Sequence, residues 1–214
     1  MKQISIKPIN GMRQMGVLLF LLFISCTVYA QDKNAERLII DIPFISITSN
    51  KAIQIGTKAD FFLTDKLGIA VGGSFRNYEA PNRPKDYKPG GLGGWLTNDE
   101  SNNGMGEFFV RGLFSRPINP GSRTSFNVEL GPSLIVGNKS TFTPKNSEMF
   151  GSNYEVGKNN HATIGASASA GIRFQSKRAI GLGIHINGNA NALNSFAGGG
   201  LSFFVDLKKV KSPN

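Results

Sequence analysis

The sequence predicts an all-β chain that forms an eight-stranded, antiparallel, up-and-down transmembrane β-barrel with a filled lumen. Three observations support this fold class. Apolar and polar side chains alternate along most of the chain after residue 30, the alternating segments are often 10–12 residues long, and short connections alternate with long ones. Period-two alternation is typical of strands that bury one face, and strands of about ten residues suit a tilted crossing of a bilayer.

The first 30 residues have the pattern of a cleaved secretory signal peptide. A basic stretch precedes an apolar run over residues 16–25, which is too short to span a bilayer as a helix, and small residues precede a cleavage site after Ala30. We therefore expect a signal peptide over 1–30 and an outer-membrane β-barrel domain over 31–214. The alternative is that Cys26, the single cysteine, is lipidated instead of removed.

The clearest alternation lies over 161–175, where every apolar side chain larger than glycine occupies an even position. The first strand contains Pro43, which cannot donate to a ladder, and a bulge is expected there. The same parity test predicts strands over 37–49, 52–63, 67–78, 107–114, 125–136, 161–175, 179–190 and 199–208.

The connections between these strands differ in length according to the side on which they lie. If the chain starts on the periplasmic side, every periplasmic turn is short, and the long loops 79–106 and 137–160 lie on the outer side. Short periplasmic turns and longer external loops are typical of outer-membrane barrels. We therefore expect outer-membrane localisation and contact with outer-membrane lipids.

Alternation alone does not distinguish a membrane barrel from a soluble barrel with an apolar interior, so the facing is decided by side-chain type. Phenylalanines of apolar parity lie near one end of their strands, as in an interfacial girdle: Phe61, Phe114, Phe126, Phe174 and Phe203. The polar parity carries charges of both signs in equal number, as expected in a narrow lumen where charges must be paired. The predicted luminal charge network comprises Lys58, Arg76, Arg111, Arg173 and Lys208 with Asp41, Asp60, Glu107, Glu129 and Asp206.

Aromatic residues in the two long loops are candidates for contacts outside the cell, although they could instead pack on the barrel rim. They are Tyr87, Trp95, Phe142, Phe150 and Tyr154. The chain has 24 basic and 14 acidic residues. This excess does not indicate nucleic-acid binding, because no basic helix or aromatic platform accompanies it.

Four segments carry a resemblance to a known family: residues 62–75 (FLTDKLGIAVGGSF), 107–118 (EFFVRGLFSRPI), 126–137 (FNVELGPSLIVG) and 198–207 (GGGLSFFVDL). With them the chain resembles the small OmpA/OmpX-type outer-membrane β-barrels, particularly the outer membrane protein beta-barrel domain of Bacteroidetes-like bacteria. Such barrels often end on an aromatic residue that the insertion machinery recognises. This chain ends on Asn214, so the resemblance implies an internal signal near Phe203 and Phe204.

The sequence predicts no catalytic, cofactor or metal site. His161 lies at a loop–strand junction, and parity points His185 into the lumen, whereas a metal site needs at least two such ligands close together. The segment 185–190 resembles the His-x-Ser-Asn stretch of outer-membrane lipid A deacylases. Asn187 stands at the serine position, and an asparagine cannot serve as the nucleophile.

The predicted function is that of an integral outer-membrane protein with a structural or interaction role through its external loops. Another envelope or extracellular protein is the candidate partner for those loops. Three alternatives stay open at this level: a narrow pore for small solutes, a soluble exported lipocalin-like barrel that binds a ligand, and a lipid A-modifying enzyme.

Overall fold

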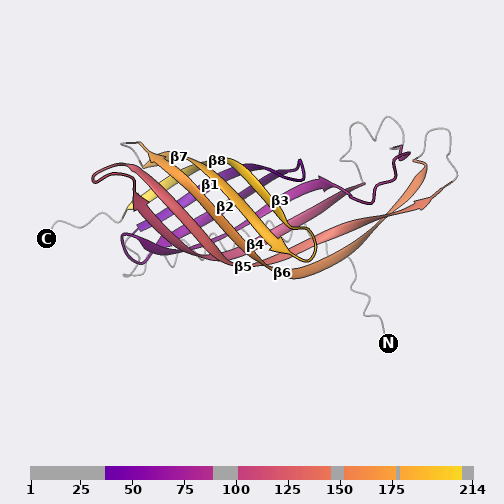
Figure 1. Ribbon diagram of the computed structural model, residues 1–214, viewed down its shortest axis with the longest axis horizontal. Helices are drawn as coiled ribbons and strands as arrows, with labels where there is room; N and C mark the ends of the chain where they lie inside the picture. Colours follow the sequence, from indigo (N-terminus) through magenta and orange to yellow (C-terminus); the bar gives the residue numbers. More distant parts are fainter. Residues whose placement is uncertain (1–36, 89–100, 146–151, 177–178, 209–214) are drawn as a thin grey trace. The chain divides into compact units, whose positions relative to one another are not determined.

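The computed structural model describes residues 37–88, 101–145, 152–176 and 179–208 (Figure 1). The predicted signal peptide, Trp95 and Phe150 lie outside the described residues. Within the described part of the chain, no helix has the length and hydropathy of a membrane span. The strands are β1 (Arg37–Thr48), β2 (Ile53–Phe62), β3 (Leu67–Glu79), β4 (Asn102–Pro117), β5 (Thr124–Pro144), β6 (Tyr154–Gln175), β7 (Ile180–Asn191) and β8 (Phe196–Lys208).

The eight strands form one closed antiparallel sheet in sequence order, and β1 pairs with β8 to complete the ring. The register of β1 shifts between Asp41 and Phe44 in both of its ladders. This confirms the bulge predicted near Pro43. The predicted eight-stranded up-and-down barrel is therefore confirmed, and every strand hydrogen-bonds on both edges.

The apolar parity faces outward, as predicted. Ile164, Phe174 and Leu182 are 77%, 45% and 49% exposed, whereas Ser167 and Arg173 on the opposite parity are 1% and 6% exposed. Four of the five predicted girdle phenylalanines are exposed, and Phe61 is half-buried. The outward belt also includes Ile45, Ile47, Ile53, Ile55, Leu67, Ile69, Val110, Val128, Leu130, Leu134, Ile184, Ile186 and Leu201. A belt of this kind on the outside of a closed barrel matches the hydrocarbon of a bilayer.

The prediction of a long loop over 137–160 is wrong for most of that range. Residues of β5 and β6 stay paired from Gly137 opposite His161 to Pro144 opposite Tyr154. These residues form an extension of the β5–β6 hairpin that continues past the end of the neighbouring strands (Figure 1). Parity missed it because an extension that lies beyond the apolar belt has no lipid-facing side. Its strand propensity comes instead from residues such as Thr141, Phe142 and Val156.

The predicted loop 79–106 is also shorter than expected, because β4 begins at Asn102. Ser140 N–H donates to the Asn103 side-chain oxygen at 2.7 Å, and the Asn82 amide donates to the Ser140 carbonyl at 2.9 Å. The β3–β4 connection is therefore hydrogen-bonded to the hairpin extension near both of its ends, through Asn82 and Asn103.

Two apolar clusters lie inside the barrel, one near each end. Ile39, Phe62, Leu113 and Phe204 cluster near the end that carries the β2–β3 turn. Near the opposite end, Ala52, Tyr78, Met105 and Ile135 form the second cluster, against which Leu193 packs. Glycines make room for the larger rings: a Cβ on Gly181 would lie 2.2 Å from the ring of Phe204. The polar lumen is thus bounded by apolar side chains at both ends.

The outward setting of Leu130 gives a direct test of whether the belt faces lipid. Leu130 is 65% exposed and pairs with Gly112 and Ala168, in the middle of the belt. Because arginine near the bilayer midplane costs about 2–4 kcal/mol, Leu130→Arg is expected to lower the free energy of unfolding of the barrel in lipid vesicles by about that amount. The measurement is equilibrium unfolding in urea, with Leu130→Met as the matched control. On a water-exposed surface the arginine would change stability by about 0.5 kcal/mol or less, and that result would contradict a lipid-facing belt.

Candidate functional site

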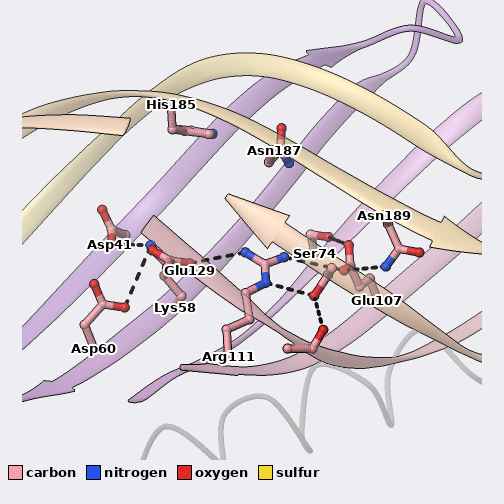
Figure 2. A network of polar contacts seen from close by, with 12 residues as sticks. Asp41, Lys58, Asp60, Ser74, Glu107, Arg111, Glu129, His185, Asn187 and Asn189 are labelled. Carbon is pink, nitrogen blue, oxygen red and sulfur yellow. Dashed lines mark hydrogen bonds and ion pairs between the residues drawn. The ribbon is translucent and has the colours of Figure 1, made fainter. Parts of the chain in front are cut away.

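The centre of the lumen is a network of charged side chains from different strands (Figure 2). Lys58 on β2 donates to Glu129 on β5, and its Nζ lies 3.8 Å from a carboxylate oxygen of Asp41 and of Asp60. All three carboxylates are buried, and the side chain of Lys58 is nearly so. A lone charge would be costly in such an environment, so each charge depends on its partners.

Two arginines extend this network towards the two ends of the barrel. Arg173 lies 2.5 Å from both Asp41 and Asp60. Arg111 donates to Glu129 at 3.3 Å and lies 3.5 Å from Glu107. The Asn189 amide then donates to Glu107 at 2.8 Å. The chain of contacts therefore runs along the lumen from β1 and β2 to β4, β5, β6 and β7.

Uncharged side chains fill the space beside the ions. Arg111 Nε donates to Ser167 Oγ at 2.9 Å, the Gln54 amide donates to Ser74 Oγ at 2.7 Å, and the Asn187 amide donates to the Gln54 oxygen at 2.8 Å. Gln54 and Ser74 are not part of the luminal charge network that the sequence predicts. Their polar parity on β2 and β3 is the signal that could have found them.

The ion pair nearest the β6–β7 turn involves a residue that the sequence did not single out. Arg37 lies 2.5 Å from Asp206, and the Gln175 amide donates to the same carboxylate at 2.7 Å. Arg37 is the first residue of β1, where parity is hardest to assign. The side chain of Lys208, which was predicted to face the lumen, lies outside the described residues.

Arg76 lies near the opposite end of the lumen and has different partners. Its Nη2 donates to the Asn194 carbonyl at 2.8 Å and contacts the sulfur of Met105 at 3.0 Å. Its guanidinium lies 3.7 Å from the ring centroid of Phe196, a cation–π contact. Within the described residues, Arg76 has no ion pair, unlike the other luminal cations.

His185 faces the lumen, as parity predicted, but its partner is a serine on another strand. His185 Nε2 lies 2.8 Å from Ser46 Oγ, and the imidazole packs edge-on against Phe44 with ring centroids 5.7 Å apart. Ser46 is 1% exposed, so an acyl substrate has no route to it. The cavity beside His185, Lys58 and Arg111 has a volume of about 20 Å³, which is room for about one water molecule.

The predicted external aromatics come together where the structure describes them. The rings of Tyr87, Phe142 and Tyr154 have centroids 5.6–6.4 Å apart, and Arg83 lies over the Tyr87 ring at 4.7 Å. The Tyr154 hydroxyl donates to Asp86 at 3.0 Å, and this bond raises the pKa of the Tyr154 phenol. Asn153 also bonds the backbone of residues 86 and 88, so the segment 80–88 is fastened to the hairpin.

Neither His161 nor His185 belongs to a metal-type cluster. Among the described residues, no group of three or more His, Cys, Asp and Glu side chains is arranged to hold a metal ion. His161 instead lines a pocket at the barrel mouth together with Lys139 and Asn159.

Comparison with solved structures identifies the fold. The N-terminal β-barrel domain of Pseudomonas aeruginosa OprF aligns with a TM-score of 0.50 and 14% identity, over 81% of this chain and 98% of that one. The chain has the fold of the small eight-stranded outer-membrane barrels. This confirms the predicted OmpA/OmpX-type architecture.

Two further barrels align at slightly lower TM-scores. The Yersinia pestis attachment invasion locus protein Ail gives 0.49 at 12% identity, over 81% of this chain and 99% of Ail. Pseudomonas aeruginosa OprG gives 0.48 at 10% identity, over 82% of this chain and 98% of OprG. No protein-family model matches the chain, and no curated protein matches it.

The luminal network predicts a large coupling between Lys58 and Glu129. Glu129→Gln leaves Lys58 and Arg111 without their shared carboxylate, and breaking a buried pair typically costs about 3–5 kcal/mol. In the double variant with Lys58→Met, both charges of the pair are gone, and we expect a loss smaller than the sum of the single losses by about 1–3 kcal/mol. The measurement is equilibrium unfolding of the barrel folded in lipid vesicles.

The control for this cycle is the exposed pair of Glu79 and Arg83, 3.4 Å apart. Glu79→Gln is expected to change stability by less than about 1 kcal/mol, because solvent screens exposed pairs. Strict additivity of the Lys58 and Glu129 variants would contradict an energetic role for the luminal pair.

Proposed function

We propose that this protein is exported by the signal peptide over 1–30 and inserted into the outer membrane as the barrel over 31–214. There it acts as a non-enzymatic structural or interaction element through the β3–β4 connection and the extended β5–β6 hairpin. The membrane setting rests on the outward apolar belt and on the likeness in fold to outer-membrane barrels.

The observation that carries the interaction role is the platform formed by residues 80–88 and the hairpin extension. Tyr87, Phe142 and Tyr154 pack together on it, and Asp86 and Asn153 tie the two segments to each other. A preorganised surface with aromatic side chains loses less conformational entropy on binding than a free loop does. A protein of the envelope or of the surroundings of the cell is the proposed partner.

The alternatives are less well supported by the same geometry. A pore needs a continuous water path, whereas the luminal cavity described above holds about one water molecule. A lipocalin-like soluble barrel needs an apolar interior and a polar exterior, which is the reverse of the facing of Arg173 and Ile164. A lipid A-modifying hydrolase needs a reachable nucleophile, and His185 pairs with the buried Ser46.

The proposed topology can be tested by cysteine labelling, because removal of the signal peptide would leave a cysteine-free chain. Lys85 is exposed on the segment beside the hairpin, and Asn119 is exposed in the β4–β5 turn at the other end of the barrel. With a membrane-impermeant maleimide on intact cells, Lys85→Cys is expected to be labelled and Asn119→Cys to be protected. After permeabilisation, both variants should react.

Three outcomes would each overturn a part of the proposal. Labelling of Asn119→Cys alone in intact cells would invert the topology. Recovery of the protein in the soluble fraction after a carbonate wash would show that it is not inserted in the membrane. Background labelling of the chain without an introduced cysteine would show that Cys26 is retained.

A further inference from the structure

A pocket of about 330 Å³ lies at the mouth of the barrel, on the side where the β5–β6 hairpin extends. Four separate parts of the chain form it: the end of β3 with the segment that follows it, the start of β4, the base of the hairpin extension and the β7–β8 turn. The volume is at the lower end of the range typical of small-molecule sites, about 300–1,000 Å³. The pocket is distinct from the aromatic cluster of the platform, because Tyr87, Phe142 and Tyr154 do not line it.

The walls of this pocket are rich in amide groups, contributed by Asn82, Asn103, Asn159 and Asn194. Two of these amides are held by their oxygens: Asn103 accepts from Ser140 N–H at 2.7 Å, and Asn194 accepts from the Asn50 amide at 2.6 Å. Within the described residues, neither bond occupies the NH₂ group, which can donate to a ligand. Amides that both donate and accept, in one pocket with the ring of Tyr78 and the apolar side chain of Leu193, match a ring that carries hydroxyl groups.

The electrostatics of the pocket favour an anion. Lys139 and His161 line it, and no carboxylate is found among its described lining residues. Arg76 lies behind the lining: its guanidinium is 5.4 Å from the Tyr78 ring and donates to the Asn194 carbonyl. Arg76 is 2% exposed, and its Nη1 has no hydrogen-bond partner. Glu107 attracts Arg76 from within the lumen, but its carboxylate is paired with Arg111 at 3.5 Å and makes no ion pair with Arg76. A buried cation that has no ion pair of its own directs a positive potential towards the pocket.

We propose that the mouth pocket binds a sugar that carries a carboxylate or a phosphate. The asparagine amides bind the hydroxyl groups, and Lys139 and His161 bind the anionic group in the field of Arg76. Such a sugar could belong to an acidic polysaccharide or to a phosphorylated glycolipid headgroup. The inference deepens the proposed function in one respect, since the mouth opens to the outside only if the proposed topology holds.

The test is ligand binding by the mature barrel folded in detergent, measured by titration calorimetry or by NMR. The probes are glucuronate, glucose 6-phosphate, neutral glucose and inorganic phosphate. We expect both anionic sugars to bind at least about tenfold more tightly than glucose or phosphate alone, because only they engage the amides and the cations together. Tighter binding of glucuronate points to a sugar acid as the natural source, and tighter binding of glucose 6-phosphate points to a phosphorylated sugar.

A matched pair of variants separates this site from general attraction to a basic surface. Lys139→Gln removes a pocket cation, and loss of one charge-assisted bond is expected to weaken binding about tenfold. Lys158→Gln removes an exposed charge on the opposite strand of the same hairpin, outside the pocket lining, and should leave affinity unchanged. Both lysines are exposed, so neither variant is expected to impair folding.

Three results would overturn the proposal. They are equal losses in the two variants, binding of glucose as tight as that of the anionic sugars, and no binding of either anionic sugar. Because the titration uses detergent-folded protein, its failure is separate from a failure of the topology, which the cysteine labels report.

Discussion

The pairing of buried charges in the lumen is the constraint on which the rest of this barrel depends. Asp41, Lys58, Arg111, Glu129 and Arg173 come from five different strands, and each is surrounded by low-dielectric protein rather than by water. None could remain charged there without its partners. A slip of one residue in any of these strands would turn its charges into the hydrocarbon and its apolar side chains into the lumen, so the network and the register support each other.

The same constraint explains where function can reside. The ion network fills the centre of the lumen, and the clusters around Phe204 and Tyr78 bound it near the two ends. The cavity beside Lys58, Arg111 and His185 has room for about one water molecule, which is too small for a substrate. The parts that take no share in the luminal network lie outside the belt, where β5 and β6 continue past their neighbours and the segment 80–88 packs against them (Figure 1). The mouth pocket lies at the junction of these two regions, with Arg76 beneath it and the hairpin beside it.

The sequence was most informative where one face of a strand meets lipid. Alternation over 161–175 assigned Ile164 to the exterior and Arg173 to the interior, because period-two patterns follow directly from strand geometry. Parity also assigned Glu129 and Lys58 to the interior. It did not predict that they form an ion pair, since pairing depends on barrel closure and register. It did not detect the hairpin extension, where Thr141 and Phe142 have no lipid face to reveal them. The pocket at Lys139 was equally hidden, because its walls come from segments far apart in the sequence.

The central claim is that paired side chains close the lumen, and electrical recording of the wild-type barrel in a planar lipid bilayer tests it most directly. A lumen whose central cavity holds about one water molecule should pass no ions, so we expect insertion without stepwise increases in current. Stable single-channel steps of uniform size from the inserted protein would contradict the account, because they would require a continuous water path through the network of Lys58, Glu129 and Arg111.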